Sequence, residues 1–205
     1  MKTVALFGFS ANPPTGEGGH VGIVTWLLQA PLPELDGDVV DEVWALPVFA
    51  HRFTEKRDMP SFEHRFAMAQ LAFRGLDRVR VLDTERRVAA ACPEPGTIDL
   101  VRHLEAEHPG VRLVLVVGQD AHRDLLDGRW KEGAALQQAV RIVVIRRPGW
   151  GAGAGHEVPG LAPISSTEIR AAADPAALRA VPEPVADYII RHRLYGFEPP
   201  PSTGG

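Results

Sequence analysis

The sequence predicts an α/β protein built on one doubly wound parallel sheet. Short apolar runs, which suit strands buried on both faces, alternate along the chain with longer segments of helical pattern. Such alternation implies right-handed crossovers between parallel strands. The glycine-rich segment after the first apolar run agrees with this fold, because ligands of doubly wound sheets bind at the carboxyl ends of the strands.

The strands and helices are placed in chain order as follows. Strands are predicted at 3–7, 43–47, 79–82, 111–117 and 141–145. Helices are predicted at 21–30, 61–73, 98–107, from 121 to 126, at 167–173 and at 184–193. In the second helix, Phe62, Phe66, Ala69 and Phe73 recur at three- and four-residue spacing, which indicates a core face rather than an aromatic binding site.

Composition sets the outer limits. The 205 residues are enough for one α/β domain, expected at 1–197, followed by a disordered tail at 198–205. The segment 148–163 is rich in Gly, Ala and Pro, and we expect it to be a mobile loop. A net charge of -4 gives no electrostatic footprint for nucleic acid, and the lone Cys92 excludes an internal disulfide and a cysteine zinc cluster.

Location and assembly are constrained less strongly. The chain has no apolar run of transmembrane length and no signal-peptide pattern before its first strand, so we expect no membrane partner and a cytoplasmic location. The sequence leaves a homo-oligomer open.

The segment between the first strand and the first helix is the strongest candidate site. It contains Gly16, Gly18 and Gly19, which allow a close approach of backbone to a ligand, and it delivers His20 to the helix N-terminus. Free N–H groups and the helix dipole favour an anion there, and a histidine can donate to a phosphate. Taken alone, the loop is equally compatible with a solvated surface loop, since it lacks the Walker lysine and GxGxxG spacing.

Two more clusters follow predicted strands. Asp120, after Gly118, has the place of a residue that accepts hydrogen bonds from a ribose, or of a helix N-cap. Arg146 and Arg147 follow the last strand, where one faces the site and the other is a solvated charge in our interpretation.

A third cluster opens the helix predicted at 167–173. Ser165 and Glu168 have capping-box spacing. Capping does not require three consecutive hydroxyls followed by Arg170, a pattern that suits one polyphosphate.

These motifs together resemble those of bacterial nicotinate-nucleotide adenylyltransferases, members of the nucleotidylyltransferase superfamily. The superfamily has G-x-F-[DN]-P-P-H-x-G-H near the N-terminus and I-S-[SA]-T-x-I-R near the C-terminus. The matching stretches here are Gly8-Phe9-Ser10, Asn12-Pro13-Pro14 with Gly19-His20, and Ile164 to Arg170. Weaker matches, in the family's order, are His51-Arg52, His64-Arg65, Thr97-Ile98-Asp99, Gly118-Gln119-Asp120, Trp130, Arg146-Arg147-Pro148-Gly149-Trp150 and 182–195.

The resemblance implies a Rossmann-like nucleotidylyltransferase domain and a reaction between ATP and a pyridine mononucleotide, nicotinate mononucleotide. The phosphate of the mononucleotide would attack the α-phosphorus of ATP, with Mg²⁺ bound through the ATP phosphates and no dedicated metal site on the protein. Catalytic roles would fall to His20, Thr15 and Arg170. The ATP-binding residues would be Gly8, Phe9, Ser10, Gly19, Gly118, Asp120, Ser165, Ser166 and Thr167. The acceptor-binding residues would be Asn12, His51, Arg52, Thr97, Trp130 and Arg147.

Individual roles follow from the same resemblance. His20 would contact the α-phosphate, while Arg170 and its neighbouring hydroxyls would hold the β- and γ-phosphates. Trp130 would stack on the pyridine ring; a partly buried surface aromatic is the alternative.

The chain departs from the family pattern in two places. The segment from Pro14 to His20 is two residues longer than H-x-G-H, so that either Thr15 or Glu17 stands for the first histidine; we favour Thr15, because a glutamate beside a triphosphate is unfavourable. Gly96 stands where the family has an aromatic residue. A related transferase with another acceptor or nucleotide, and a nucleotide-binding protein with impaired catalysis, are the alternatives.

Overall fold

The computed structural model describes residues 1–49, 59–146, 148–149, 155–162, 165–172 and 174–198. Its strands are β1 (Lys2–Phe9), β2 (Glu42–Pro47), β3 (Val79–Val81), β4 (Val111–Gly118) and β5 (Arg141–Ile145). Its α-helices are α1 (His20–Leu27), α2 (Phe62–Ala72), α3 (Thr84–Ala91), α4 (Thr97–Glu107), α5 (Gln119–Leu126), α6 (Gly133–Ala139), α7 (Ser166–Ala172) and α8 (Glu183–Arg191). Short 3₁₀ helices are η1 (Pro33–Leu35), η2 (Pro175–Ala180) and η3 (Leu194–Gly196).

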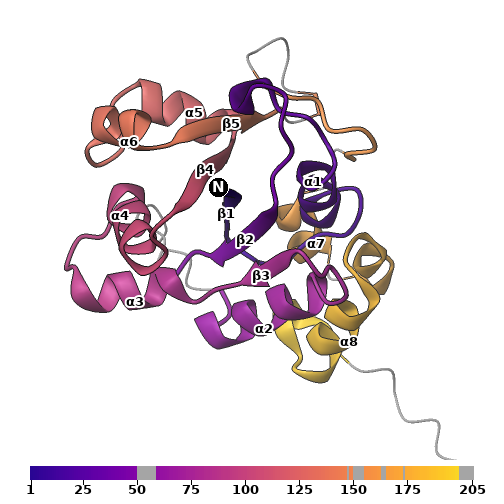
Figure 1. Ribbon diagram of the computed structural model, residues 1–205. Helices are drawn as coiled ribbons and strands as arrows, with labels where there is room; N and C mark the ends of the chain where they lie inside the picture. Colours follow the sequence, from indigo (N-terminus) through magenta and orange to yellow (C-terminus); the bar gives the residue numbers. More distant parts are fainter. Residues whose placement is uncertain (50–58, 147, 150–154, 163–164, 173, 199–205) are drawn as a thin grey trace, which may run out of the picture.

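The strands form one parallel sheet in the order β3-β2-β1-β4-β5, which confirms the predicted doubly wound fold (Figure 1). The central strand β1 pairs with β2 on one side and with β4 on the other, so that Phe7 lies beside Ala45 and Val116. The strand order reverses between β1 and β4. A doubly wound sheet binds its ligands in the crevice at such a reversal, outside the carboxyl ends of the strands.

Helices cover both faces of the sheet, because alternate residues of β1 point to opposite faces. Phe7 packs in a cluster with Leu27 of α1, whereas Leu6 packs in a second cluster with Leu104 of α4 (Figure 1). A third cluster joins α2, α7 and α8 beside the sheet. This third cluster brings the C-terminal part of the chain against the helix that follows β2.

Two helices, α3 and α6, were not among the predicted elements. Each buries little apolar surface: the buried residues of α3 are Thr84 and Val88, and α6 buries Leu136. A helix with so few buried positions shows no clear three- and four-residue apolar spacing, so its sequence carries only a weak signal.

Residues 155–162, within the predicted loop 148–163, form a loop that is attached to the rest of the protein at several points. His156 forms a parallel bridge to Ile145, with its N–H donating to the Val144 carbonyl at 2.8 Å. Val158 is buried in the first cluster, and the N–H of Ala162 donates to the Gly18 carbonyl at 2.9 Å. The segment therefore lies against both β5 and the glycine-rich loop.

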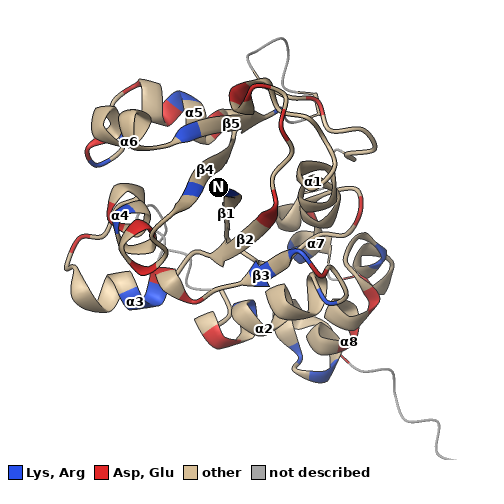
Figure 2. Cartoon of the chain, in the orientation of Figure 1, with Lys and Arg blue, Asp and Glu red and all other residues tan. Residues whose placement is uncertain are grey.

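Charged side chains of both signs are interspersed over the helices (Figure 2). Exposed ion pairs such as Arg102–Glu132 and Arg129–Asp124 join some of them. Within the described ranges, every helix falls short of the length and apolar character that a membrane span needs.

Glu85, in the first turn of α3, generates a prediction about pH. Burial raises the pKa of its carboxyl from 4.5 to about 7, so the folded protein holds this proton more tightly than the unfolded chain does. The free energy of unfolding should therefore fall between pH 4.5 and 7.5, and E85Q should remove up to about 3 kcal/mol of that fall. Urea denaturation across this range measures it. Glu105 is exposed on α4, so E105Q should keep the wild-type pH dependence; an E85Q profile parallel to wild type would contradict the prediction.

Candidate active site

The chain leaves β1 through a buried turn. Ala11 has a left-handed backbone conformation with φ of 52°, and the peptide bond between Asn12 and Pro13 is cis. Asn12 and Thr15 are polar residues with exposed fractions of only 2% and 4%. Buried polar groups need hydrogen-bond partners, and the partners of Asn12 and Thr15 come from the segments that surround this turn.

Thr15 and His20 form a close pair at the start of α1. The backbone N–H of Thr15 donates to His20 Nδ1 at 3.0 Å, and Thr15 Oγ1 lies 2.6 Å from the same nitrogen. In return, the backbone N–H of His20 donates to Thr15 Oγ1 at 2.9 Å. A backbone N–H can only donate, so Nδ1 is an acceptor and the neutral ring carries its proton on Nε2.

The imidazole of His20 is also held by aromatic packing. Its ring centroid lies 5.1 Å from that of Phe9 and 6.1 Å from that of Phe7. Ring packing and the bonds to Nδ1 together fix the orientation of the imidazole, with Nε2 on the side of the ring away from Thr15.

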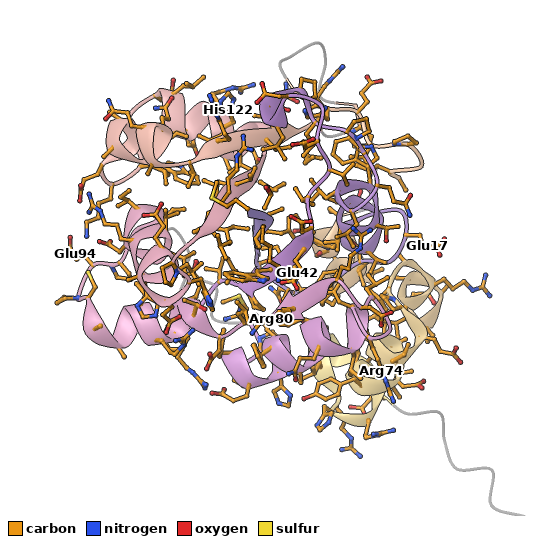
Figure 3. The ribbon with its side chains drawn as sticks, in the orientation of Figure 1. Glu17, Glu42, Arg74, Arg80, Glu94 and His122 are labelled. Atoms are coloured by element: carbon orange, nitrogen blue, oxygen red, sulfur yellow. The ribbon has the colours of Figure 1, made fainter. Side chains whose placement is uncertain are left out.

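Two glycines let the lengthened loop close on itself. A Cβ on Gly19 would overlap Thr15 Oγ1, and a Cβ on Gly22 would overlap the Glu17 carbonyl oxygen. Glu17 itself is exposed and lies at the edge of the molecule, whereas Thr15 is buried against His20 (Figure 3). The longer loop thus places Thr15, and not Glu17, beside the histidine.

The C-terminal motif meets the N-terminal one through backbone carbonyls. Ser166 Oγ donates to the Pro13 carbonyl at 2.8 Å, and Arg170 donates to the Asn12 carbonyl at 2.5 Å and to Thr167 Oγ1 at 3.1 Å. Both motifs therefore lie together at the exit of β1.

Ser165 is engaged in capping. Its Oγ and its backbone N–H both donate to Glu168, and the N–H of Glu168 donates back to Ser165 Oγ at 3.2 Å. The capping box expected from the spacing is therefore present.

The hydroxyl of the half-buried Tyr195 also contacts this turn. Tyr195 donates to Asn12 Oδ1 at 2.8 Å. Burial raises the pKa of the Tyr195 hydroxyl well above its usual value, against the smaller opposing effects of Arg170 and Arg65. The hydroxyl thus keeps its proton and remains a donor.

Arg65 is a structural centre that the motif match left without a role. Its exposed fraction is 1%, and its guanidinium donates to the carbonyls of Ser10 at 2.9 Å, Val48 at 2.6 Å and Phe49 at 3.1 Å. Its Nε donates to the Pro60 carbonyl at 3.3 Å. Arg65 therefore joins the ends of β1 and β2 to Pro60, shortly before α2. The signal was present in the sequence, because Arg65 falls on the apolar face of α2 that also carries Phe62 and Met68.

The carboxyl end of β4 supplies the opposite wall of the crevice. Gly118 caps α5, so Asp120 lies inside the first turn of the helix and the N-cap alternative for it is wrong. Gln119 is buried, and its Oε1 is the one buried side-chain oxygen or nitrogen without a hydrogen-bond partner in the part of the chain described.

On β1, Gly8 is exposed and would have open space around a Cβ. An exposed residue on a central strand marks the open crevice.

The predicted acceptor residues are divided. Thr97 opens α4, and Trp130 is half-buried against the cluster that contains Leu104. His51, Arg52 and Arg147 lie outside the described residues. Arg146 forms an ion pair with Glu157 at 2.9 Å.

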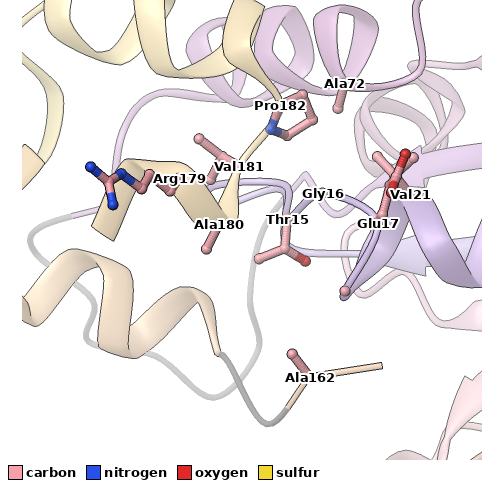
Figure 4. Close-up of a pocket in the computed structure, with 11 residues that line it drawn as sticks. Thr15, Gly16, Glu17, Val21, Ala72, Ala162, Arg179, Ala180, Val181 and Pro182 are labelled. Atoms are coloured by element: carbon pink, nitrogen blue, oxygen red, sulfur yellow. The ribbon is translucent and has the colours of Figure 1, made fainter. Parts of the chain in front are cut away.

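The lengthened loop also lines a pocket of about 500 Å³ (Figure 4). Thr15, Gly18, Ala162 and Val181 form part of its wall, and Arg179 points away from Thr15. Neither His20 nor Asp120 is among the described residues that line it, so this pocket is not the crevice between β1 and β4.

Comparisons with known proteins agree with this arrangement. A family model described as cytidylyltransferase-like matches residues 19–172. A probable nicotinate-nucleotide adenylyltransferase of Anaeromyxobacter dehalogenans is 36% identical over 196 residues, which cover 95% of this chain and 97% of the relative. A protein of the same name from Myxococcus xanthus is 35% identical over 204 residues and 97% of each chain. The nicotinic acid mononucleotide adenylyltransferase of Plasmodium falciparum, solved with NaAD, shares the fold with a TM-score of 0.74 at 20% identity, covering 97% of this chain and 99% of that one.

Arg65 yields a prediction about stability. R65M would leave several buried carbonyls without a donor, which should lower the free energy of unfolding by about 3 kcal/mol. Urea denaturation measures this loss. R129M is the matched control, because Arg129 makes only exposed ion pairs with Asp124 and Asp127, worth less than about 1 kcal/mol. Equal stability losses in the two variants would show that the carbonyl contacts of Arg65 do not matter.

Proposed function

The chain belongs to the nicotinate-nucleotide adenylyltransferases of the cytidylyltransferase-like family, and on this premise we propose that it transfers AMP from ATP to nicotinate mononucleotide. The products are deamido-NAD and pyrophosphate, which makes the reaction a step of NAD biosynthesis. The observation that carries the proposal is His20, whose imidazole is held at the start of α1 by the contacts of Thr15 with Nδ1. We also assign residues 1–197 to one catalytic domain, supported by the packing of α8 against α2.

The reaction is a displacement at phosphorus. A phosphate oxygen of the mononucleotide forms a bond to the α-phosphorus of ATP, and the bond from this phosphorus to the bridging oxygen of the β-phosphate breaks. Negative charge grows on the oxygens around the α-phosphorus and on the leaving pyrophosphate. Catalysis then consists of positioning the two substrates and stabilising this charge, with no covalent enzyme intermediate.

His20 stabilises the transition state in this mechanism. Its Nε2–H donates to an oxygen of the α-phosphate as charge develops there. Thr15 acts through His20, because its N–H and Oγ1 hold Nδ1 and thereby the ring orientation. Rigid placement of a donor before the substrate arrives avoids the cost of orienting it during the reaction.

The remaining contacts to ATP follow from the two walls of the crevice. Gly8, Phe9 and Ser10 at the end of β1 lie beside the end of β4, where Gly118 and Asp120 begin α5, and we place the adenosine over these two strand ends. We place the β- and γ-phosphates at the start of α7, beside Ser166, Thr167 and Arg170.

Mg²⁺ enters this site with ATP in our proposal. Phosphate oxygens are ligands that Mg²⁺ prefers, and the described residues contain no group of three or more His, Cys, Asp or Glu arranged to hold a metal ion. When bound, Mg²⁺ neutralises charge on the β- and γ-phosphates.

The acceptor binds on the side of Thr97 and Trp130. Trp130 stacks on the pyridine ring, and Thr97 donates to the carboxylate at the N-terminus of α4. Asn12, His51, Arg52 and Arg147 complete the set that we propose for the mononucleotide.

His20 gives the sharpest test of the mechanism. H20A should lower kcat by about 10²- to 10³-fold, because one preorganised donor to the transition state is removed. Pyrophosphate release from ATP and nicotinate mononucleotide measures the rate. The free energy of unfolding of H20A should stay close to that of the wild type, which shows that the fold is kept. H103A is the control, since His103 lies on α4 in an exposed pair with Glu107. Near-normal turnover in H20A would remove His20 from the mechanism.

Acceptor choice tests the function as a whole. Pyrophosphate release should be fastest with nicotinate mononucleotide, slower with nicotinamide mononucleotide, and absent with phosphopantetheine, because only the first offers a carboxylate to the α4 N-terminus. Turnover with another acceptor alone would reassign the substrate. Binding of ATP without pyrophosphate release from any of the three would favour a nucleotide-binding protein.

A further inference from the structure

Lys131 connects the two segments that carry Thr97 and Trp130. Its ammonium donates to Asp99 Oδ2 at 2.8 Å and to the Glu94 carbonyl at 3.0 Å, and lies 3.8 Å from Cys92 Sγ. Glu94 and Cys92 precede Thr97, and Lys131 follows Trp130 directly. One side chain therefore joins the chain ahead of α4 to the chain after α5.

Gly96 shows how closely Lys131 packs against this segment. A Cβ on Gly96 would lie 2.9 Å from the Cβ of Lys131 and 3.1 Å from its Cδ. The aliphatic stem of the lysine thus fills the space that a side chain at position 96 would need. Glycine at this position, where the family has an aromatic residue, is explained by the lysine.

Asp99 accepts hydrogen bonds from both sides of the contact between Lys131 and the segment ahead of α4, which we call the Lys131 junction. Its Oδ2 accepts from Lys131 and also from the backbone N–H of Gly96 at 2.8 Å. Burial alone would raise the pKa of Asp99, but the hydrogen bonds from Lys131 and Gly96 and the charge of Lys131 hold this pKa below its usual value. The carboxylate stays ionised and keeps both donors in place.

The junction is more than an exposed ion pair. The side chains of Lys131 and Asp99 are 31% and 21% exposed, whereas the nearby pair Arg102–Glu132 is 52% and 44% exposed. Arg102–Glu132 joins α4 to the residue after Lys131, with a distance of 2.7 Å, but within the described part of the chain its hydrogen bonds run between these two side chains and not to the segment from Cys92 to Thr97. The Lys131–Asp99 pair therefore also binds backbone groups, whereas the Arg102–Glu132 pair joins side chains only, and the second pair can serve as a control for the first.

We propose that Lys131 is a positioning residue for the acceptor, which sets the separation of Thr97 and Trp130 across the pyridine ring. This inference rests on the proposed function, because a pyridine ring binds between Thr97 and Trp130 only if the acceptor is a pyridine mononucleotide. Lys131 acts through its neighbours: it fixes the start of α4 through Asp99 and Glu94, and it fixes Trp130 through the chain that joins them.

The test is the effect of K131M on the two substrates separately. Methionine keeps an apolar stem over Gly96 and removes the ammonium, so KM for nicotinate mononucleotide should rise about tenfold while KM for ATP stays within about twofold. R102M, which breaks only the exposed pair, should leave both values within about twofold of wild type. K131R should recover part of the loss, because it restores a donor to Asp99.

The outcomes separate the two hypotheses. An unchanged acceptor KM in K131M, or an equal rise for both substrates, would overturn the positioning role while leaving the transferase intact. A loss of thermal stability with both KM values unchanged would also overturn it. A wild-type protein without turnover on nicotinate mononucleotide would overturn the proposed function, and the role of Lys131 with it.

Discussion

The site depends on how the backbone carbonyls at the exit of β1 are satisfied. Where the chain leaves the sheet, the carbonyls of Ser10, Asn12 and Pro13 lose their strand partners while they remain largely buried, and a buried carbonyl without a donor costs about 1–3 kcal/mol. Arg65 from α2, and Arg170 and Ser166 from α7, supply the donors. The need to pair these groups brings two distant segments to the loop that carries His20.

The same constraint explains how a longer loop is tolerated. The two extra residues fall between Thr15 and His20, and close approaches at Gly19 and Gly22 let the loop return so that Thr15 still meets the imidazole. Glu17 is displaced outward, where water solvates its charge. The contact with Nδ1 is thus kept, and the added length is taken up at the surface.

Much of this could be predicted from sequence, and the failures have physical causes. All strands follow from apolar runs, and the meeting of both motifs follows from the topology of a parallel sheet. Helices α3 and α6 bury too few residues to show the apolar spacing of a helix. The packing of 155–162 against β5 depends on backbone hydrogen bonds, which leave no signal in the side-chain sequence. The packing of Lys131 on Gly96 could not be predicted either, because the two residues are far apart in sequence and neither belongs to a recognisable motif.

The two sides of the site are held by different kinds of interaction, and this bears on where the chain can vary. On the side where we propose that ATP binds, the side chains of Arg65 and Arg170 donate to backbone carbonyls, so a change at either residue leaves a carbonyl without this donor. On the side where we propose that the acceptor binds, Lys131 pairs with the side chain of Asp99 and also donates to the Glu94 carbonyl. The first contact can be replaced by a paired change of two side chains, whereas the second depends on a backbone group. The departure from the family pattern at Gly96 lies on this second side, against the stem of Lys131, whereas the carbonyl contacts of Arg65 and Arg170 lie at the exit of β1.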